Sequence, residues 1–190
     1  MIRKQRHLSL SKMMRGRSMS KYLTVPYTRE LLSAARDFDC GNLAISSFLR
    51  SDDAFLEMVG KTFVMLLDKK VIGYYNISTG HIEDGNEYRV GGSVYINFFA
   101  VDQSVQKHKV SNADADTQNI SDLLLSDCLN RICDLRSSHI GFAFITLSST
   151  QEGYHLYERN GFFPLEDDMK IAKNQGEKTC APMYFPIDYE

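Results

Sequence analysis

The chain has 190 residues, 43% of them hydrophobic, and a formal net charge of −2, which suits one globular domain rather than several. It contains no run of about 18 apolar residues that could span a membrane and no apolar stretch near its first residue that would direct secretion, so a cytoplasmic protein is expected. The four cysteines lack Cys-x-x-Cys spacing and the five histidines are scattered, which predicts reduced thiols and no metal site.

The charges are unevenly distributed. Residues 1–21 hold seven Lys or Arg and no acid, which leaves 15 basic against 24 acidic residues, a formal charge of −9, on the rest of the chain. We divide the sequence into a basic N-terminal arm, residues 1–20, and one domain, residues 21–190. The arm could contact nucleic acid, but its few aromatic residues favour an arm without a binding role, upstream of a natural start at Met19. A cleaved transit peptide is a third alternative.

The first part of the domain is predicted to contain short elements. Pro26 suits an edge strand. Asn42 suits a helix N-cap, because its side-chain oxygen can accept from free amides of the first turn. The predicted elements are an extended segment at 22–28, a brief helix at 29–38, a turn at Asp39–Gly41, a helix over Leu43–Arg50 and a second helical stretch at 52–61 that Gly60 ends.

The middle of the chain predicts three strands. Residues 62–68 and 69–79 are rich in apolar, aromatic and β-branched residues, and a tight turn at Asp68–Lys70 joins them as a hairpin. Residues 80–92 are polar and contain four glycines, which indicates a loop. Residues 93–102 are almost wholly apolar and indicate a central strand.

A glycine-free segment at 103–120 leads into a β-α-β unit. Strands on either side of a crossover helix are parallel, so residues 93–102 should lie beside residues 140–149. The crossover helix, at about 122–136, has an apolar face at helical spacing, formed by Leu124, Leu125, Cys128, Leu129, Ile132 and Leu135.

The last elements are a helix at 150–160, which Gly161 ends, and a strand at 180–187. The complete order predicts an α/β fold with a central mixed sheet. The hairpin strands are antiparallel in this sheet, and helices cover its faces.

This order, with the segments VIGYYNIST, NFFAVDQSVQ, LYERNGFFPL and APMYFPI in place, resembles the GNAT superfamily of acyl-CoA-dependent N-acyltransferases over about residues 22–187. The segments FDCGNLAISSFLR and VIGYYNIST are similar to the branch that includes toxins of toxin–antitoxin pairs, which acetylate the amino group of aminoacyl-tRNA. The resemblance implies a GNAT-like fold, acetyl-CoA as cosubstrate and no metal.

In this fold two parallel strands, INFFAVD and FAFITLSS here, splay apart around the acyl-CoA. Splaying frees backbone groups that a continuous ladder would use, so the pantetheine arm can pair with them. The resemblance implies main-chain contacts from Phe99, Ala100 and Val101. The alternative, that these three are ordinary core residues, is compatible with the first.

The family next has a Gln/Arg-x-x-Gly-x-Gly/Ala loop, whose backbone amides bind the pyrophosphate at a helix N-terminus. Gln106 is in register, but Lys109 and Ser111 occupy the glycine positions, and residues 111–120 are an insertion. This departure leaves a retained and a lost cofactor site as alternatives.

Two replacements for the glycines are available. The side chains of Lys107, His108 and Lys109 could bind phosphate, as could backbone amides near Ser121 and Asp122. The carboxylates of Asp114, Asp116 and Asp122 put like charge in the same region and favour loss of the site.

Tyr157 matches the family's tyrosine on the helix after the second splayed strand. The resemblance implies that its phenol protonates the departing CoA thiolate as a general acid. Thr150 falls where the family often has a CoA contact, and Gly153 falls where a small residue is usual. The alternative for Tyr157 is a packed aromatic residue.

The general base is not evident. Some family members have a Glu on the central strand, where this chain has Asn97. His81, Glu83 and an ordered water are the alternatives, and an amine of low pKa would need no strong base. A nucleophilic role for Cys40 is disfavoured, since a turn and a helix cap explain its surroundings.

The sequence thus predicts an N-acetyltransferase that transfers acetyl from acetyl-CoA to a primary amine by direct attack in a ternary complex. Toxin-type acetylation of aminoacyl-tRNA, with tRNA and an antitoxin-like protein as partners, is the first alternative. The FDCGN segment and the arm favour it, and the acidic domain disfavours it. The second alternative is an inactive GNAT-fold binding or regulatory protein, which the glycine-free loop favours.

Overall fold

The computed structural model describes residues 22–111, 117–172 and 179–187. The basic arm of residues 1–20 lies outside the described residues, as do Asp114 and Asp116. The elements are β1 (Leu23–Pro26), η2 (Arg29–Ala35), α1 (Leu43–Arg50), η3 (Asp52–Phe55), β2 (Lys61–Leu67), β3 (Lys70–Asp84), β4 (Arg89–Val101), β5 (Lys109–Ser111), β6 (Thr117–Asn119), α2 (Ile120–Ser138), β7 (Phe144–Ser149), α3 (Tyr154–Arg159), β8 (Phe163–Pro164), β9 (Met169–Ile171) and β10 (Ala181–Pro186).

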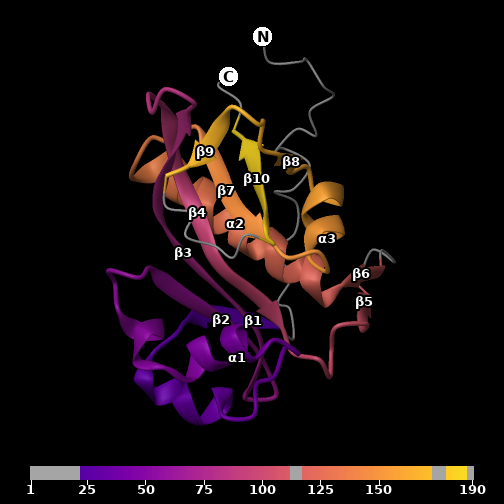
Figure 1. The fold of residues 1–190 in the computed structure, drawn as a ribbon. Coiled ribbons are helices and arrows are strands. Elements are labelled where there is room, and N and C mark those ends of the chain that lie inside the picture. Colours follow the sequence, from indigo (N-terminus) through magenta and orange to yellow (C-terminus); the bar gives the residue numbers. More distant parts are fainter. Residues whose placement is uncertain (1–21, 112–116, 173–178, 188–190) are drawn as a thin grey trace.

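Eight of the described strands form a large mixed sheet in the order β1-β2-β3-β4-β7-β10-β8, with β9 pairing the far end of β3, and β5 and β6 form a separate two-stranded sheet. Strands β4 and β7 are parallel, and the other neighbours are antiparallel. The predicted β-α-β unit and mixed sheet are confirmed. Figure 1 shows the N-terminal elements, in indigo and purple, gathered at one end of the long strands β3 and β4.

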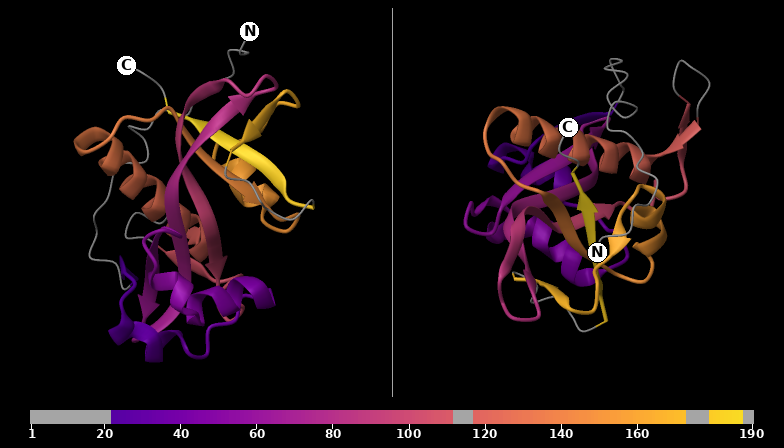
Figure 2. Two further views of the ribbon diagram at one scale, coloured as in Figure 1. Left: turned by 60° about the vertical axis from the view of Figure 1, so that its left-hand side comes forward. Right: turned by 90° about the horizontal axis from the view of Figure 1, so that it is seen from above.

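Helices cover both faces of the sheet (Figure 2). On one face, α2 packs through the predicted apolar stripe, and Leu135 is its one partly buried member. On the opposite face, η2, α1 and η3 pack on alternate residues of β2 and β3, such as Val64 and Tyr74. The period-2 alternation of strand side chains explains why these strands serve two cores. No helix of the described residues has the length and hydrophobicity needed to cross a membrane.

The predicted loop at residues 80–92 is wrong. Strand β3 continues to Asp84 and β4 begins at Arg89, so only a short turn separates them. Gly91 lies within β4. A side chain does not fit at this position, because a Cβ there would be 2.7 Å from the Phe144 ring. This glycine therefore permits close packing rather than a turn.

Several local predictions are confirmed. Asp68 and Lys69 have φ of 49° and 64°, as a tight hairpin turn requires. The Asn42 side chain accepts a hydrogen bond from the Ile45 amide at 3.1 Å and caps α1. Gly161, with φ of 90°, follows the end of α3. The two helical stretches at 29–38 and 52–61 are shorter than predicted and are 3₁₀ helices.

Candidate active site

Strands β4 and β7 separate after a short parallel ladder. Their register covers only Ser93–Ile96 against Phe144–Leu147, although β4 runs on to Val101. The β3 register is Asn76 with Phe98 and Ile77 with Ile96, so Asn97 is an extra residue on β4. Such a β-bulge bends its strand, and this one directly follows the last residue paired to β7. The bulge therefore gives a physical cause for the splay.

The Asn97 side chain fixes the bulge. Its Nδ2 lies within hydrogen-bond distance of three acceptors, Asn76 Oδ1 at 2.6 Å, Ser78 Oγ at 2.9 Å and the Val59 carbonyl at 3.2 Å, which share its two hydrogens. Gly60 packs directly against this network. A side chain does not fit there, because a Cβ at that position would lie 2.5 Å from Asn76 Oδ1. Asn97 thus has a structural role at the position where a base was considered.

The predicted main-chain contacts lie in the splayed part of β4. Phe99, Ala100 and Val101 pair with β3 on one side, and on the side of β7 no described strand pairs with them. Ala100 and Val101 are buried. The carbonyl of Val101 accepts a hydrogen bond from Gln106 Nε2 at 3.0 Å, so this carbonyl is already engaged.

The second half of the glycine-free segment contains two short paired strands. Strands β5 and β6 pair antiparallel, with Lys109 opposite Asn119, and α2 begins directly after β6. The Ile120 amide donates to the carbonyl of His108 at 3.3 Å. Helix α2 therefore begins two residues before the expected start near residue 122. The hairpin places Lys107, His108 and Lys109, all exposed, beside the first turn of α2.

Gln106 links two segments that are far apart in sequence. Besides the Val101 carbonyl, its Nε2 donates to the carbonyl of Cys40 at 3.0 Å. The amide of Gln103 donates to the carbonyl of Asp39 at 2.8 Å, and the amide of Asp39 donates to Asp102 Oδ2 at 2.9 Å. The segment after β4 and the turn before α1 therefore form one unit, which no sequence signal predicted.

The Asp39–Asn42 turn has the local geometry expected of it. Asp39 Oδ1 accepts from the Gly41 amide at 2.8 Å, and Gly41 has φ of 89°. Cys40 Sγ lies 3.3 Å from Ser46 Oγ. A hollow of about 410 Å³ adjoins this turn and is lined by Arg36, Asp37, Phe38, Asp39, Gly41, Leu43, Ser46, Arg50 and Gln103.

Tyr157 lies on α3 and points into the sheet. Its ring is 7% exposed and meets Phe99 edge to face, with ring centroids 6.0 Å apart, and Phe162 at 5.6 Å. Burial raises the pKa of the Tyr157 phenol, and Cys128 and Tyr95 nearby add to this effect. No described residue forms a hydrogen bond with its hydroxyl. The phenol is therefore protonated at neutral pH.

Thr150 and Gly153 shape the start of α3. Thr150 Oγ1 accepts from the Gly153 amide at 3.3 Å. A Cβ at Gly153 would lie 3.2 Å from Ser149 Oγ and 3.4 Å from the Tyr157 ring. A small residue is thus required for Tyr157 to pack here. Whether Thr150 contacts a cofactor stays a prediction.

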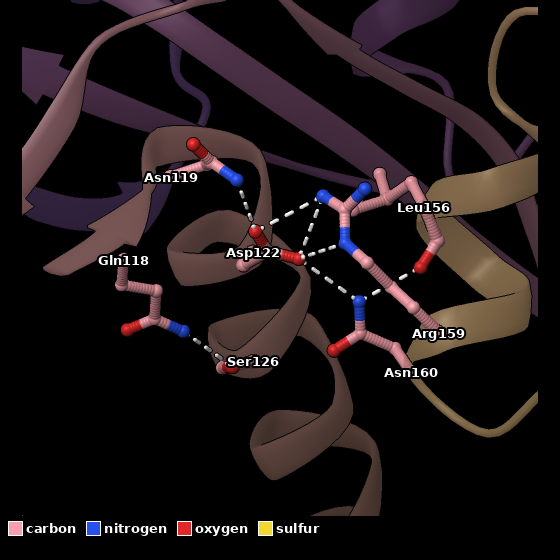
Figure 3. Close-up of polar contacts among 7 residues, drawn as sticks. All are labelled: Gln118, Asn119, Asp122, Ser126, Leu156, Arg159 and Asn160. Carbon is pink, nitrogen blue, oxygen red and sulfur yellow. Dashed lines mark hydrogen bonds and ion pairs between the residues drawn. The ribbon is translucent and has the colours of Figure 1, made fainter. Parts of the chain in front are cut away.

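Asp122, expected near the phosphates, forms an ion-pair cluster (Figure 3). Its carboxylate accepts from Arg159 Nε and Nη2, each at 3.0 Å, from Asn160 Nδ2 at 3.0 Å and from Asn119 Nδ2 at 3.0 Å. The neighbouring Ser121 is partly buried at the same helix start. Asp122 therefore joins α2 to α3, and its charge is already paired.

The alternative bases lie at the other end of β3. Tyr75 is the β3 residue that pairs with Phe99. His81 lies six residues further along β3 than Tyr75, which is about 20 Å at about 3.3 Å per residue. His81 Nε2 lies 2.8 Å from Glu83 Oε1. His81 and Glu83 therefore lie well along β3 from Phe99, and a role for either as the base stays a prediction.

The fold is GNAT-like, as the sequence resemblance implied. No protein-family model matches the chain, and no curated protein matches it. A bacterial toxin of known structure shares 17% identity, with 87% of this chain and 90% of the other covered and a TM-score of 0.68. A tyrosine-to-phenylalanine mutant of the AtaT toxin, bound to the C-terminus of the antitoxin AtaR and acetyl-CoA, shares 19% identity, with coverages of 87% and 92% and a TM-score of 0.64.

A third similar structure is AtaT complexed with acetyl-methionyl-tRNAfMet. It shares 18% identity, with 87% of this chain and 94% of the other covered, and a TM-score of 0.63. Similarity to the toxin-type branch is thus confirmed at the level of the fold.

Proposed function

We propose that this protein is an N-acetyltransferase that transfers acetyl from acetyl-CoA to a primary amine. The observation that carries the proposal is the position of Tyr157, whose ring packs on Phe99 at the splay between β4 and β7. An open strand edge beside a protonated phenol without a described partner suits thioester chemistry. Similar structures that contain acetyl-CoA or an acetylated tRNA agree with it.

The residues present fit acetyl-CoA in two parts. The unpaired side of β4, at residues 97–101, can pair with the extended pantetheine arm. The pyrophosphate would lie against the side chains of Lys107–Lys109 and the first turn of α2, where positive charge and helix amides coincide. Gln106 would contribute indirectly, because its side chain holds the end of β4 in place.

When bound, acetyl-CoA supplies a thioester carbonyl to the attacking amine. The amine nitrogen bonds to the carbonyl carbon, the carbon–sulfur bond breaks, and the Tyr157 hydroxyl gives its proton to the sulfur. The phenolate then regains a proton that the amine loses, through water. Burial raises the pKa of a thiolate for the same reason that it raises the pKa of the Tyr157 phenol, so transfer between the two stays feasible.

Acetylation of the α-amino group of aminoacyl-tRNA is the second candidate. An α-amino group has a pKa of about 8, so part of the amine is uncharged at neutral pH and needs no strong base. Structures of AtaT complexed with acetyl-methionyl-tRNAfMet, and of an AtaT mutant bound to the C-terminus of the antitoxin AtaR, are known. An antitoxin-like protein would then be a partner of this chain, in the cytoplasm. The formal charge of −9 outside the arm counts against this acceptor.

A binding protein with this fold but without turnover is the third candidate. It is favoured by the β5–β6 hairpin, which replaces the glycine turn of the phosphate loop. Isothermal titration with acetyl-CoA and an acetyl-transfer assay together separate it from the first two. Binding at micromolar concentration with acetyl transfer supports a transferase, binding without transfer supports the third candidate, and no binding at millimolar acetyl-CoA would remove the enzyme proposal.

A comparison of acceptors then separates the first two candidates. Acetyl transfer to aminoacyl-tRNA but not to free amines or peptides supports the toxin-type reaction. Deletion of residues 1–18 should weaken tRNA association in a salt-dependent manner if the arm contacts phosphates. Equal association with and without the arm would remove that role.

A further inference from the structure

The cluster around Asp122 connects the longest helix with the helix that carries Tyr157. Asp122 lies in the first turn of α2, which is 19 residues long and buried along one face. Arg159 and Asn160 are the last residue and the C-cap of α3. Two consecutive residues of α3 thus bind one carboxylate of α2 (Figure 3).

Helix α3 needs such an anchor, because it has only six residues. Isolated helices shorter than about 12 residues are marginal in water, so α3 depends on contacts with the rest of the protein. At its start, one hydrogen bond between Gly153 and Thr150 is made within the same turn. At its end, Asp122 supplies contacts from another element.

The anchored turn is the one that presents Tyr157. The Asn160 and Phe162 amides both donate to the carbonyl of Tyr157, at 3.0 and 3.1 Å. Asn160 Nδ2 also donates to the Leu156 carbonyl at 2.7 Å. A shift of Asn160 therefore moves the backbone of Tyr157 with it.

The ion pair between Asp122 and Arg159 has a bidentate geometry, which is typical of strong ion pairs. Arg159 binds both carboxylate oxygens of Asp122 through its fork of nitrogens, and bidentate pairs of this kind fix direction as well as distance. The Asp122 side chain is only 15% exposed, although that of Arg159 is 48% exposed. The negative charge also lies at a helix N-terminus, where the helix dipole favours it.

We propose that Asp122 is a positioning residue that holds α3, and with it the Tyr157 hydroxyl, at the splay of β4 and β7. The catalytic part of this inference rests on the proposed function, and the structural part does not. The competing explanation is that the carboxylate occupies the place of a cofactor phosphate and opposes its binding. The two explanations predict opposite effects on acetyl-CoA affinity.

Amide hydrogen exchange tests the structural part without any turnover. Asp122→Asn keeps the size of the side chain and removes its charge. The amides of residues 154–162 should then exchange about tenfold faster, since local opening is less costly. Asp134→Asn, an exposed position on the same helix, is the matched control and should leave α3 unchanged. Arg159→Gln removes the other half of the pair and should reproduce the effect if Asp122→Asn fails to fold. Unchanged exchange in α3 overturns the proposal.

Kinetics test the catalytic part. Asp122→Asn should lower kcat about tenfold through misplacement of the phenol, with acetyl-CoA KM changed less than about twofold. Asp122→Glu, which keeps the charge, should recover most of the rate. In a Tyr157→Phe background, Asp122→Asn should cost little more, because the hydroxyl it positions is gone.

Three other outcomes would contradict either the positioning role of Asp122 or the proposed function. Multiplying losses in the double variant, or tighter acetyl-CoA binding by Asp122→Asn, would overturn the positioning role. If the wild-type protein binds acetyl-CoA but transfers no acetyl group, the proposed function fails, and hydrogen exchange still decides whether Asp122 holds α3.

Discussion

The ring of Tyr157 meets the ring of Phe99 edge to face at a centroid distance of 6.0 Å. One residue comes from the short helix α3 and the other from the splayed part of β4, so this contact sets the phenol beside the unpaired edge of the sheet. The main prediction about catalysis depends on this pair.

Tyr157→Phe should lower kcat at least about tenfold, because general acid catalysis contributes roughly 10²- to 10⁴-fold. The ring contacts with Phe99 and Phe162 remain, so affinity for acetyl-CoA, measured by titration calorimetry, should stay within about twofold. A rate equal to that of wild type would remove the general-acid role. A parallel loss of folding, visible by circular dichroism, would show instead that the hydroxyl is structural.

Replacing Lys107 and Lys109 together by Ala should weaken acetyl-CoA binding about 5- to 20-fold at low salt, with a smaller effect at high salt, because exposed charges are screened. Acetyl-pantetheine, which lacks the pyrophosphate, should bind both proteins equally. Lys61→Ala, an exposed lysine on β2, is the control. Equal weakening for both thioesters would place the lysines outside the phosphate site.

Gly60→Ala should destabilise the protein by about 2–5 kcal/mol, since it combines backbone strain with overpacking. Gly60 has φ of 140°, and a Cβ there would lie 2.6 Å from the Ile77 carbonyl oxygen. Gly141→Ala is the matched control, because nothing lies within 4 Å of a Cβ at Gly141. Urea unfolding measures both, and equal midpoints would contradict the packing argument.

Glu83→Gln should make the free energy of unfolding less dependent on pH at acidic pH. The hydrogen bond with His81, and then Lys170, lower the pKa of Glu83. A carboxylate with a lowered folded pKa stabilises the protein above its unfolded pKa of about 4.3, and this contribution is lost as the pH falls through the folded value. Urea midpoints at pH 7 and pH 3 should therefore differ less in the variant than in wild type.

Glu152→Gln, an exposed position in the turn before α3, is the control for this comparison and should leave the pH dependence as it is. The distance of about 20 Å along β3 also predicts that Glu83→Gln leaves kcat unchanged. A large loss of kcat would favour Glu83 as the base.

The sequence predicted what depends on local chemistry. The Asn42 cap, the Asp68–Lys69 turn and the apolar face of α2 follow from side chains a few residues apart, and each is confirmed. The parallel pairing of β4 with β7 follows from general rules of connection and is confirmed too.

Features that depend on distant contacts escaped prediction. Gly91 looked like a loop residue because the sequence does not reveal that Phe144 lies against it. The contacts of Asp122 were not predicted because its partners, Arg159 and Asn160, are 37 and 38 residues away. Gln106 likewise binds the carbonyl of Cys40, 66 residues earlier.

Because of the extra residue at Asn97, the end of β4 has an unpaired strand edge, although β4 is a central strand of the sheet. Outer edges of sheets are open to strands of other proteins, but this edge continues from the β4–β7 ladder, which ends at Ile96. We expect it to admit only a thin extended ligand. Its backbone groups are already held in place by β3, so the loss of conformational freedom on binding falls on the ligand and little on the protein.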